Sequence, residues 1–302
     1  MQLKMQLATT SFDRLPSRPI GRGPALNRLF SRISEMSHLP VGAQQLVRLL
    51  AGPADLEKLQ ELIQTDPSLV AQILRRVNSP YYNLDTEVND LGVAARLLGF
   101  REFSNVAFTV YLSRMFTSPI SFGTFSLSGL WAHSVAVASA AQMISRVCGR
   151  ADPNEAFMAG LLHDIGLLLC YKQMRRRFMQ VVERIQDRSI TSRVEQELYS
   201  FDHAHLGAYV ARSWGLSDTI ADAIALHHDA ENRADKQMHL VYVVAAANYL
   251  SSRAGWTSLG VHNAMPLPDH AYRTLGLDQV ALFVIWKELA TTLEKSSALA
   301  EL

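Results

Sequence analysis

Apolar residues recur every three to four positions through most of the chain, which is the spacing of amphipathic helices, and strand-like alternation is scarce. One clear stripe consists of Leu69, Ile73 and Val77. It starts after Asp66-Pro67, where a capping side chain precedes a proline at the first helical position. It ends at Asn78–Pro80, because proline disfavours the helical conformation in the residue before it. This punctuation predicts a helix, and its repetition along the chain predicts an all-α fold.

The same periodicity predicts several further helices. They cover about Leu91–Leu98 with a stop at Gly99, Arg101–Phe116, Trp131–Val147, Glu155–Tyr171, Asp202–Trp214, Asp218–His228, Lys236–Arg253 and Asp278–Lys295. Residues Pro119 to Ser128, rich in Ser, Gly and Thr, read as a linker. We therefore expect a mobile basic tail over 1–30, an N-terminal helical region over about 31–120, a helical core over about 128–255 and a C-terminal helical extension over 256–302.

Composition narrows the class of protein. The 302 residues are 48% hydrophobic, enough for a sizeable core, and the formal net charge is +1. Without a basic domain or stripe, direct binding of nucleic acid is not expected. Two cysteines make no disulfide framework, which suits a reducing compartment, and no apolar run is long enough to span a bilayer. We expect a cytoplasmic protein.

Five of the predicted helices each direct one nitrogen- or oxygen-bearing group at their apolar side. His133 lies one turn before Val137, and His163-Asp164 is surrounded by leucine and isoleucine. The other three helices contribute His203, then His227 with His228 beside it, then Asn248. Burying one unpartnered polar group costs about 1–3 kcal/mol, so these groups are expected to satisfy one another or a metal.

Imidazole and carboxylate together suit a divalent transition ion such as iron, manganese or zinc. Such an ion lowers the pKa of bound water and holds a phosphate oxygen, the basis of metal-dependent phosphoester hydrolysis. A single histidine on an apolar face is more often a hydrogen-bonded core residue, and Asp164 could simply pair with a neighbouring histidine. Spacing alone leaves these alternatives open. His205 is expected to be exposed.

The order of several short segments resembles the HDOD proteins, a regulatory branch of the HD superfamily in bacterial signalling. The most specific segment is Ala159–Gly166, which reads AGLLHDIG. The others are Asp66–Leu69, Arg75–Ser79, Ala94–Gly99, Trp131–Ser134, Asp202-His203 with Gly207, Trp214–Leu216 and Ala223-Ile224 leading to His227-His228. The resemblance runs from Leu39 to about Ser252, and it implies a helical bundle of HD type with the N-terminal helical region packed against it.

The resemblance also implies candidate metal ligands. The metal positions of the related HD-GYP phosphodiesterases, which cleave cyclic di-GMP, correspond here to six residues, namely His133, His163, Asp164, His203, His227 and His228. The last aspartate of the HD pattern falls at Asn248, and the glutamate one turn before the first histidine falls at Gly129. The Gly-Tyr-Pro segment is missing after His228. Asp222 or Asp229 could take the place of the missing aspartate.

Two hypotheses follow. The first is a non-catalytic signalling module, without catalytic residues, that acts through other signalling proteins or a small effector such as a nucleotide second messenger. It rests on the HDOD resemblance and on Gly129 and Asn248. The second is a metal-dependent phosphohydrolase acting on a nucleotide or cyclic dinucleotide, and it rests on the six ligand-type residues. A metal-bound sensor without turnover is a third alternative.

Overall fold

The computed structural model describes residues 24–185, 190–230, 238–262 and 265–301, and almost all of its regular structure is helical. The expected all-α fold, with an N-terminal helical region packed on a helical core, is confirmed. Residues 1–23 of the expected basic tail lie outside the described residues, whereas residues 24–30 form the first half of a helix. No helix in the described ranges combines the length and the apolar character that a membrane crossing requires.

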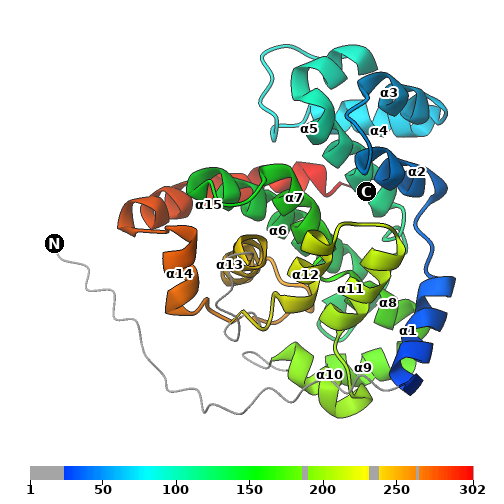
Figure 1. The fold of residues 1–302 in the computed structure, drawn as a ribbon, viewed down its shortest axis with the longest axis vertical. Helices are drawn as coiled ribbons and strands as arrows, with labels where there is room; N and C mark the ends of the chain where they lie inside the picture. The colour runs from blue at the N-terminus through cyan, green and yellow to red at the C-terminus, as the bar shows by residue number, and fades with distance from the viewer. Residues whose placement is uncertain (1–23, 186–189, 231–237, 263–264, 302) are drawn as a thin grey trace.

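The N-terminal region forms the upper part of the molecule in Figure 1, apart from its first helix, which lies against the core. Its helices are α1 (Pro24–Met36), α2 (Val41–Leu50), α3 (Leu56–Gln64), α4 (Pro67–Val77) and α5 (Leu91–Ser113). Asp66 caps α4 as predicted, accepting a hydrogen bond from the Leu69 backbone N–H. The predicted stop at Gly99 is confirmed, because its φ of +74° and ψ of 168° are not helical and α5 consists of two helices that meet there at a kink.

The core lies below this region and is built around α13 (His239–Arg253), which Figure 1 shows nearly end-on. Three of the helices that contact α13 are α6 (Leu127–Cys148), α7 (Pro153–Leu162) and α12 (Asp218–Leu226). Helix α11 (His203–Ser213) packs against α12 and against α8 (Ile165–Gln173). The expected linker before α6 contains a short hairpin of β1 (Ser121–Phe122) and β2 (Phe125–Ser126).

Two glycines allow the core helices to approach closely. A Cβ atom on Gly160 of α7 would lie 2.8 Å from the Cα of Ala138 on α6. A Cβ atom on Gly166 of α8 would lie 1.9 Å from the carbonyl oxygen of His203, the first residue of α11. Both distances are far inside van der Waals contact, so only glycine fits at either position. This packing brings the segment between α7 and α8 against the start of α11.

Two helices below the core and two at its side complete the chain. The first pair, α9 (Arg175–Arg184) and α10 (Thr191–Tyr199), packs near α8 and α11. The second pair is α14 (Asp269–Leu275) and α15 (Gln279–Leu299), and α15 runs beside α6, as both views show. The exposed Val280, Phe283 and Trp286 lie at the start of α15, whereas Leu289 and Leu293 are buried.

Candidate metal centre

His163 and Asp164 lie between two helices, which corrects the prediction that they sit within one. Helix α7 ends at Leu162 and α8 begins at Ile165, and Asp164 has φ −102° and ψ 14°, outside the helical range. The sequence shows no glycine or proline at this point, so the periodicity runs through the break unmarked. The break lets both side chains point into the space enclosed by α6, α11 and the end of α12.

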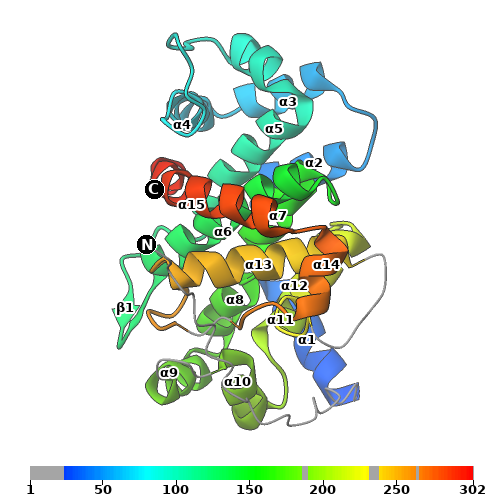
Figure 2. The ribbon, with the colours of Figure 1, turned by 90° about the vertical axis from the view of Figure 1, so that its left-hand side faces the viewer.

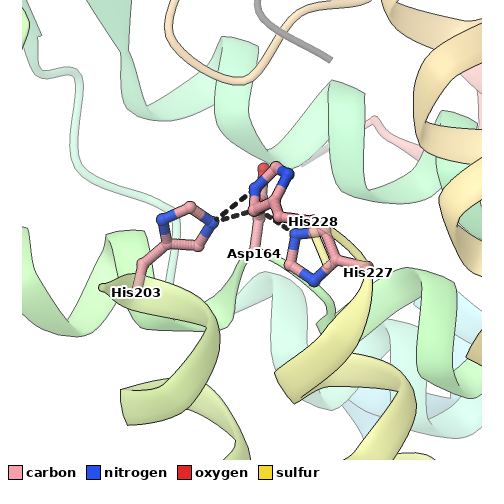
Figure 3. Close-up of side chains that lie close together, drawn as sticks. All are labelled: Asp164, His203, His227 and His228. Atoms are coloured by element: carbon pink, nitrogen blue, oxygen red, sulfur yellow. Dashed lines mark hydrogen bonds and ion pairs between the residues drawn. The ribbon is translucent and has the colours of Figure 1, made fainter. Parts of the chain in front are cut away.

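The six predicted ligand-type residues meet in that space. His133 comes from α6, His203 from the first turn of α11, and His227 and His228 follow the end of α12. Five of the six are buried, and His228 is half-buried. Figure 3 shows His203, His227 and His228 converging on Asp164.

Asp164 divides its two carboxylate oxygens between two groups of histidines. Its Oδ2 lies 3.5 Å from His133 Nε2 and 3.3 Å from His163 Nε2. Its Oδ1 lies 3.1 Å from His203 Nε2 and 3.5 Å from His227 Nε2. We call the first group, together with Asp164, the His133 side. The second group also includes His228, which lies 3.1 Å from His203, and together with Asp164 we call it the His203 side. In each group, the candidate ligand atoms all lie within 4.8 Å of one another.

Backbone carbonyls fix the orientation of three of the imidazole rings. His133 Nδ1 lies 2.7 Å from the Trp256 carbonyl oxygen, and His163 Nδ1 lies 2.7 Å from that of Gly160. His227 Nδ1 lies 2.7 Å from the carbonyl oxygen of Ile224. A carbonyl oxygen only accepts, so each Nδ1 carries the hydrogen, and in the neutral ring the Nε2 lone pair faces the centre.

These lone pairs lack hydrogen-bond donors. His133 Nε2 and His163 Nε2 face each other at 3.2 Å, and burial lowers the pKa of His163 to about 4, so that ring is neutral near pH 7. Among the described residues, His227 Nε2 is buried without a hydrogen-bond partner. Lone pairs directed at one another and at a carboxylate repel unless a cation lies among them. The donor set therefore fits a divalent transition ion, which prefers imidazole nitrogen with carboxylate oxygen.

His203 differs from the other rings because a carboxylate, and not a carbonyl, supports it. Glu195 of α10 is fully buried, and its Oε2 accepts hydrogen bonds from His203 Nδ1 at 2.5 Å and from the His203 backbone N–H at 3.0 Å. Burial favours the neutral ring, but Glu195 and Asp164 outweigh it and raise the pKa of His203 well above its usual value. Burial would likewise raise the pKa of Asp164, yet the surrounding imidazoles hold it well below its usual range.

Glu195 is not among the residues predicted from the sequence, although its helix carries a signal. Thr191, Glu195 and Tyr199 recur every four residues and all face inward, so α10 has a buried stripe. Thr191 and Glu195 are polar, so hydrophobic periodicity does not reveal this stripe. Glu195 is eight positions before His203, and that spacing predicts a contact between the two only when the turn that joins α10 to α11 is known.

The residues that depart from the HD-GYP pattern bring no acid to the centre. Asn248 is buried on α13, and Gly129 lies in the first turn of α6 beside Ser126. Asp222 is exposed and pairs with Arg212, and Asp229 is in neither group of candidate ligands. His205 keeps 38% of its side-chain surface exposed and contacts Asp202.

A pocket of about 250 Å³ adjoins the His133 side. His133 and Trp256, which share a hydrogen bond, form part of its wall. The remaining lining residues are small or carry hydroxyls: Thr124, Ser126, Gly129, Ala132, Gly255, Thr257, Ser258 and Gly260. Its volume is below that of most sites for drug-sized ligands, and no lysine or arginine is among its lining residues in the described part of the chain.

Comparison with known structures agrees with this architecture. The chain is similar to an HDOD domain protein of unknown function from Geobacter sulfurreducens, with TM-score 0.75 and 24% identity over 91% of this chain and 98% of that one. It is also similar to a suggested phosphohydrolase from Shewanella amazonensis, with TM-score 0.71 and 23% identity over 90% of this chain and 97% of that one. At these identities the likeness concerns the fold.

Curated relatives are longer than this chain. An uncharacterized protein from Treponema pallidum is 24% identical over 72% of this chain, which spans 42% of that protein. Ribonuclease Y from Opitutus terrae is 33% identical over 32% of this chain, which spans 13% of the enzyme. The HDOD domain profile matches residues 36–230, well over half of the sequence. The chain belongs to the HDOD family.

Proposed function

We propose that this protein is a non-catalytic signalling module that holds a divalent transition ion, iron, manganese or zinc, in its histidine–aspartate centre and acts through protein or small-effector contacts. The observation that carries the proposal is a cluster of six ligand-type residues that lacks two of the expected acids and adjoins a pocket without a lysine or arginine among its described lining residues. Gly129 and Asn248 stand where acidic ligands would be wanted, and the pocket beside His133 is lined without lysine or arginine. Apart from the ion itself, the described lining of this pocket offers no lysine or arginine to stabilise the negative charge that develops when a phosphodiester is hydrolysed.

A groove between the N-terminal region and the core supports the contact role. It has a volume of about 570 Å³ and lies between α1, α2 and the end of α11. Its walls include His38, Arg48 and Trp214, and the Trp214 indole N–H donates to the Ser37 carbonyl oxygen. A partner or effector bound there would touch both parts of the molecule, so its binding would depend on their relative position. That dependence is what a signalling module requires.

One observation favours a second candidate, a metal-dependent phosphohydrolase acting on a nucleotide or cyclic dinucleotide. The His133 side offers three protein donors, and an ion held by three donors keeps open positions for water or substrate. The adjoining pocket reaches His133 and would give access from solvent. Chemistry supplied by such an ion would be the activation of bound water.

Metal analysis of untagged protein and a turnover assay together decide between these functions. Wild type, His163→Ala and Asp164→Ala would be compared, with His205→Ala as a control histidine outside the centre. Stoichiometric metal in wild type and the control, lost from the two variants, with no turnover of cyclic di-GMP or a generic phosphodiester, supports the signalling proposal. Metal-dependent turnover lost in the same variants overturns it in favour of the hydrolase. Absence of metal from wild type overturns the metal-bearing role.

A further inference from the structure

Glu195 and Asp164 contact opposite edges of the His203 ring. Its Oε2 contacts His203 Nδ1, while His203 Nε2 faces Asp164 Oδ1 at 3.1 Å. In the described part of the chain, the supporting contacts of His133, His163 and His227 are all to backbone carbonyls. The two sides of the centre therefore differ, because only the His203 side has a ligand supported by a negatively charged group.

We propose that Glu195 is a positioning residue that makes the His203 side of the centre bind a divalent transition ion more tightly than the His133 side. The inference rests on the proposed metal centre and assigns an order to its two halves. A carboxylate behind a metal-binding histidine fixes the ring orientation and increases the electron density at the coordinating nitrogen. Charge-assisted hydrogen bonds are roughly twice as strong as neutral ones. A backbone carbonyl therefore fixes the ring less firmly and adds less electron density to the coordinating nitrogen than a carboxylate does.

The burial of Glu195 points the same way. The side chain is fully buried, and its Oε1 has no hydrogen-bond partner among the described residues. A carboxylate that is enclosed and only half satisfied is costly to maintain. A cation bound at His203 Nε2 offsets that cost, because its positive charge attracts the negative charge of Glu195 on the opposite edge of the imidazole ring. The His203 side also has one histidine more than the His133 side, which adds to the difference.

Glu195 also has a structural contact, since it accepts from the backbone N–H of the first residue of α11. Asp202 offers a matched control for that contact. It is similarly buried at the same helix start, where its Oδ1 accepts from the His205 backbone N–H, and its side chain contacts His205 instead of a candidate ligand. A purely structural role of a carboxylate at this turn should appear in variants of both residues.

The test is a titration of the full chain, first stripped with a chelator, with Co²⁺ and then Zn²⁺, following the Co²⁺ absorption spectrum and chelator competition. Wild type, Glu195→Gln and Asp202→Asn would be compared, and His203→Ala and His133→Ala would assign each binding step to one side. We expect Glu195→Gln to weaken the tighter step, assigned to the His203 side, by about 10–100-fold. The weaker step, and both steps in Asp202→Asn, should stay as in wild type.

Several results would overturn this inference. Equal affinities in wild type and Glu195→Gln remove it while leaving the metal centre intact, as does an equal loss in Glu195→Gln and Asp202→Asn. Assignment of the tighter step to the His133 side also contradicts it. A wild-type protein that binds no ion overturns both this inference and the proposed centre. If Glu195→Gln does not fold, Glu195→Asp replaces it, with a smaller loss expected at the same step, and an unchanged affinity would count against the proposal.

Discussion

At the scale of single residues, Asp164 is the group that the two sides of the centre share. One of its oxygens faces His133 and His163, and the other faces His203 and His227. Its replacement should therefore affect both sides, in contrast with replacement of Glu195. The shared carboxylate is also the only formal negative charge among the six ligand-type residues, so the positive charge of an ion on either side is balanced first at Asp164.

We predict that Asp164→Asn loses metal affinity at both steps of the titration, each by more than about 100-fold. The loss should exceed that of Glu195→Gln, because Asp164 is a candidate ligand whereas Glu195 only supports one. The amide is neutral and a poorer ligand for a transition ion. Metal titration of the stripped variant measures the effect, and His205→Ala is the control. Retention of either step at wild-type affinity would show that Asp164 does not serve both sides.

His163 gives the metal-free protein a specific sensitivity to acid. Burial lowers its pKa from the ordinary 6.5 to about 4. Between these values the unfolded chain binds a proton that the folded chain does not, so the free energy of unfolding falls as the pH falls. Above about pH 6.5 neither state binds this proton, and the stability that it controls is fully present. The loss amounts to about 3 kcal/mol at pH 4.

We expect the pH dependence between 6.5 and 4 to be weaker in His163→Gln than in wild type, because the variant has no group that titrates at this position. Urea unfolding of chelator-treated protein at several pH values measures it. The comparison uses the difference between the two proteins, in which the other titrating groups largely cancel. Identical slopes in wild type and variant would mean that His163 is protonated equally in both states.

Much of the site could be predicted residue by residue. His133, His203 and His227 lie on periodic apolar faces, and that periodicity holds in the structure. Glu195 could not be predicted in this way, because its role depends on α10 folding back toward α11. Nor could the division of Asp164 between two groups, because it depends on the angle at which α8 meets α11. Both features arise from tertiary packing, which periodicity does not encode.

At the scale of elements, the approach of α8 to α11 sets the distance between Asp164 and His203. Gly166 is two residues after Asp164, and a Cβ atom there would meet the carbonyl oxygen, the carbonyl carbon and the Cα of His203. All three are backbone atoms, so α11 as a whole would have to move. The sequence predicted α11, and α8 only as the second half of one longer helix, but it did not predict this contact, which depends on how the two helix axes cross.

We predict that Gly166→Ala destabilises the protein by about 3 kcal/mol, the upper end of ordinary overpacking, because backbone and not a flexible side chain must move. The displacement should also weaken metal binding on the His203 side more than on the His133 side. Urea unfolding and the metal titration measure the two effects. Gly52→Ala is a matched control, since a Cβ atom there would meet only the Leu49 carbonyl oxygen at 3.6 Å. Equal stability of the two variants would contradict the close approach.

At the scale of the whole molecule, the C-terminal end of α15 joins the N-terminal region to the core. Arg76 of α4, buried to 3% exposure, donates to the carbonyl oxygens of Leu299 and Glu301. Trp131 of α6 donates to the Ala300 carbonyl oxygen between them. Burial lowers the pKa of Arg76 to about 10, so the guanidinium stays charged at neutral pH. One short segment is thus held by a helix from each part, which links movement of α4 to the core.

We predict that Arg76→Ala releases this segment, because it leaves the carbonyl groups of Leu299 and Glu301 without their donor. Loss of the partner of the buried Leu299 carbonyl costs about 2 kcal/mol. Amide hydrogen exchange should rise in the last turn of α15 and in α4, while amides of α11 and α13 around the candidate centre should exchange as in wild type. Arg75→Ala removes the same kind of side chain from an exposed neighbouring position and serves as the control. A uniform rise over the whole chain would mean that the Arg76 contacts support the entire fold. Unchanged exchange in α15 would mean that its remaining contacts, among them the Trp131 hydrogen bond, are enough to hold the segment.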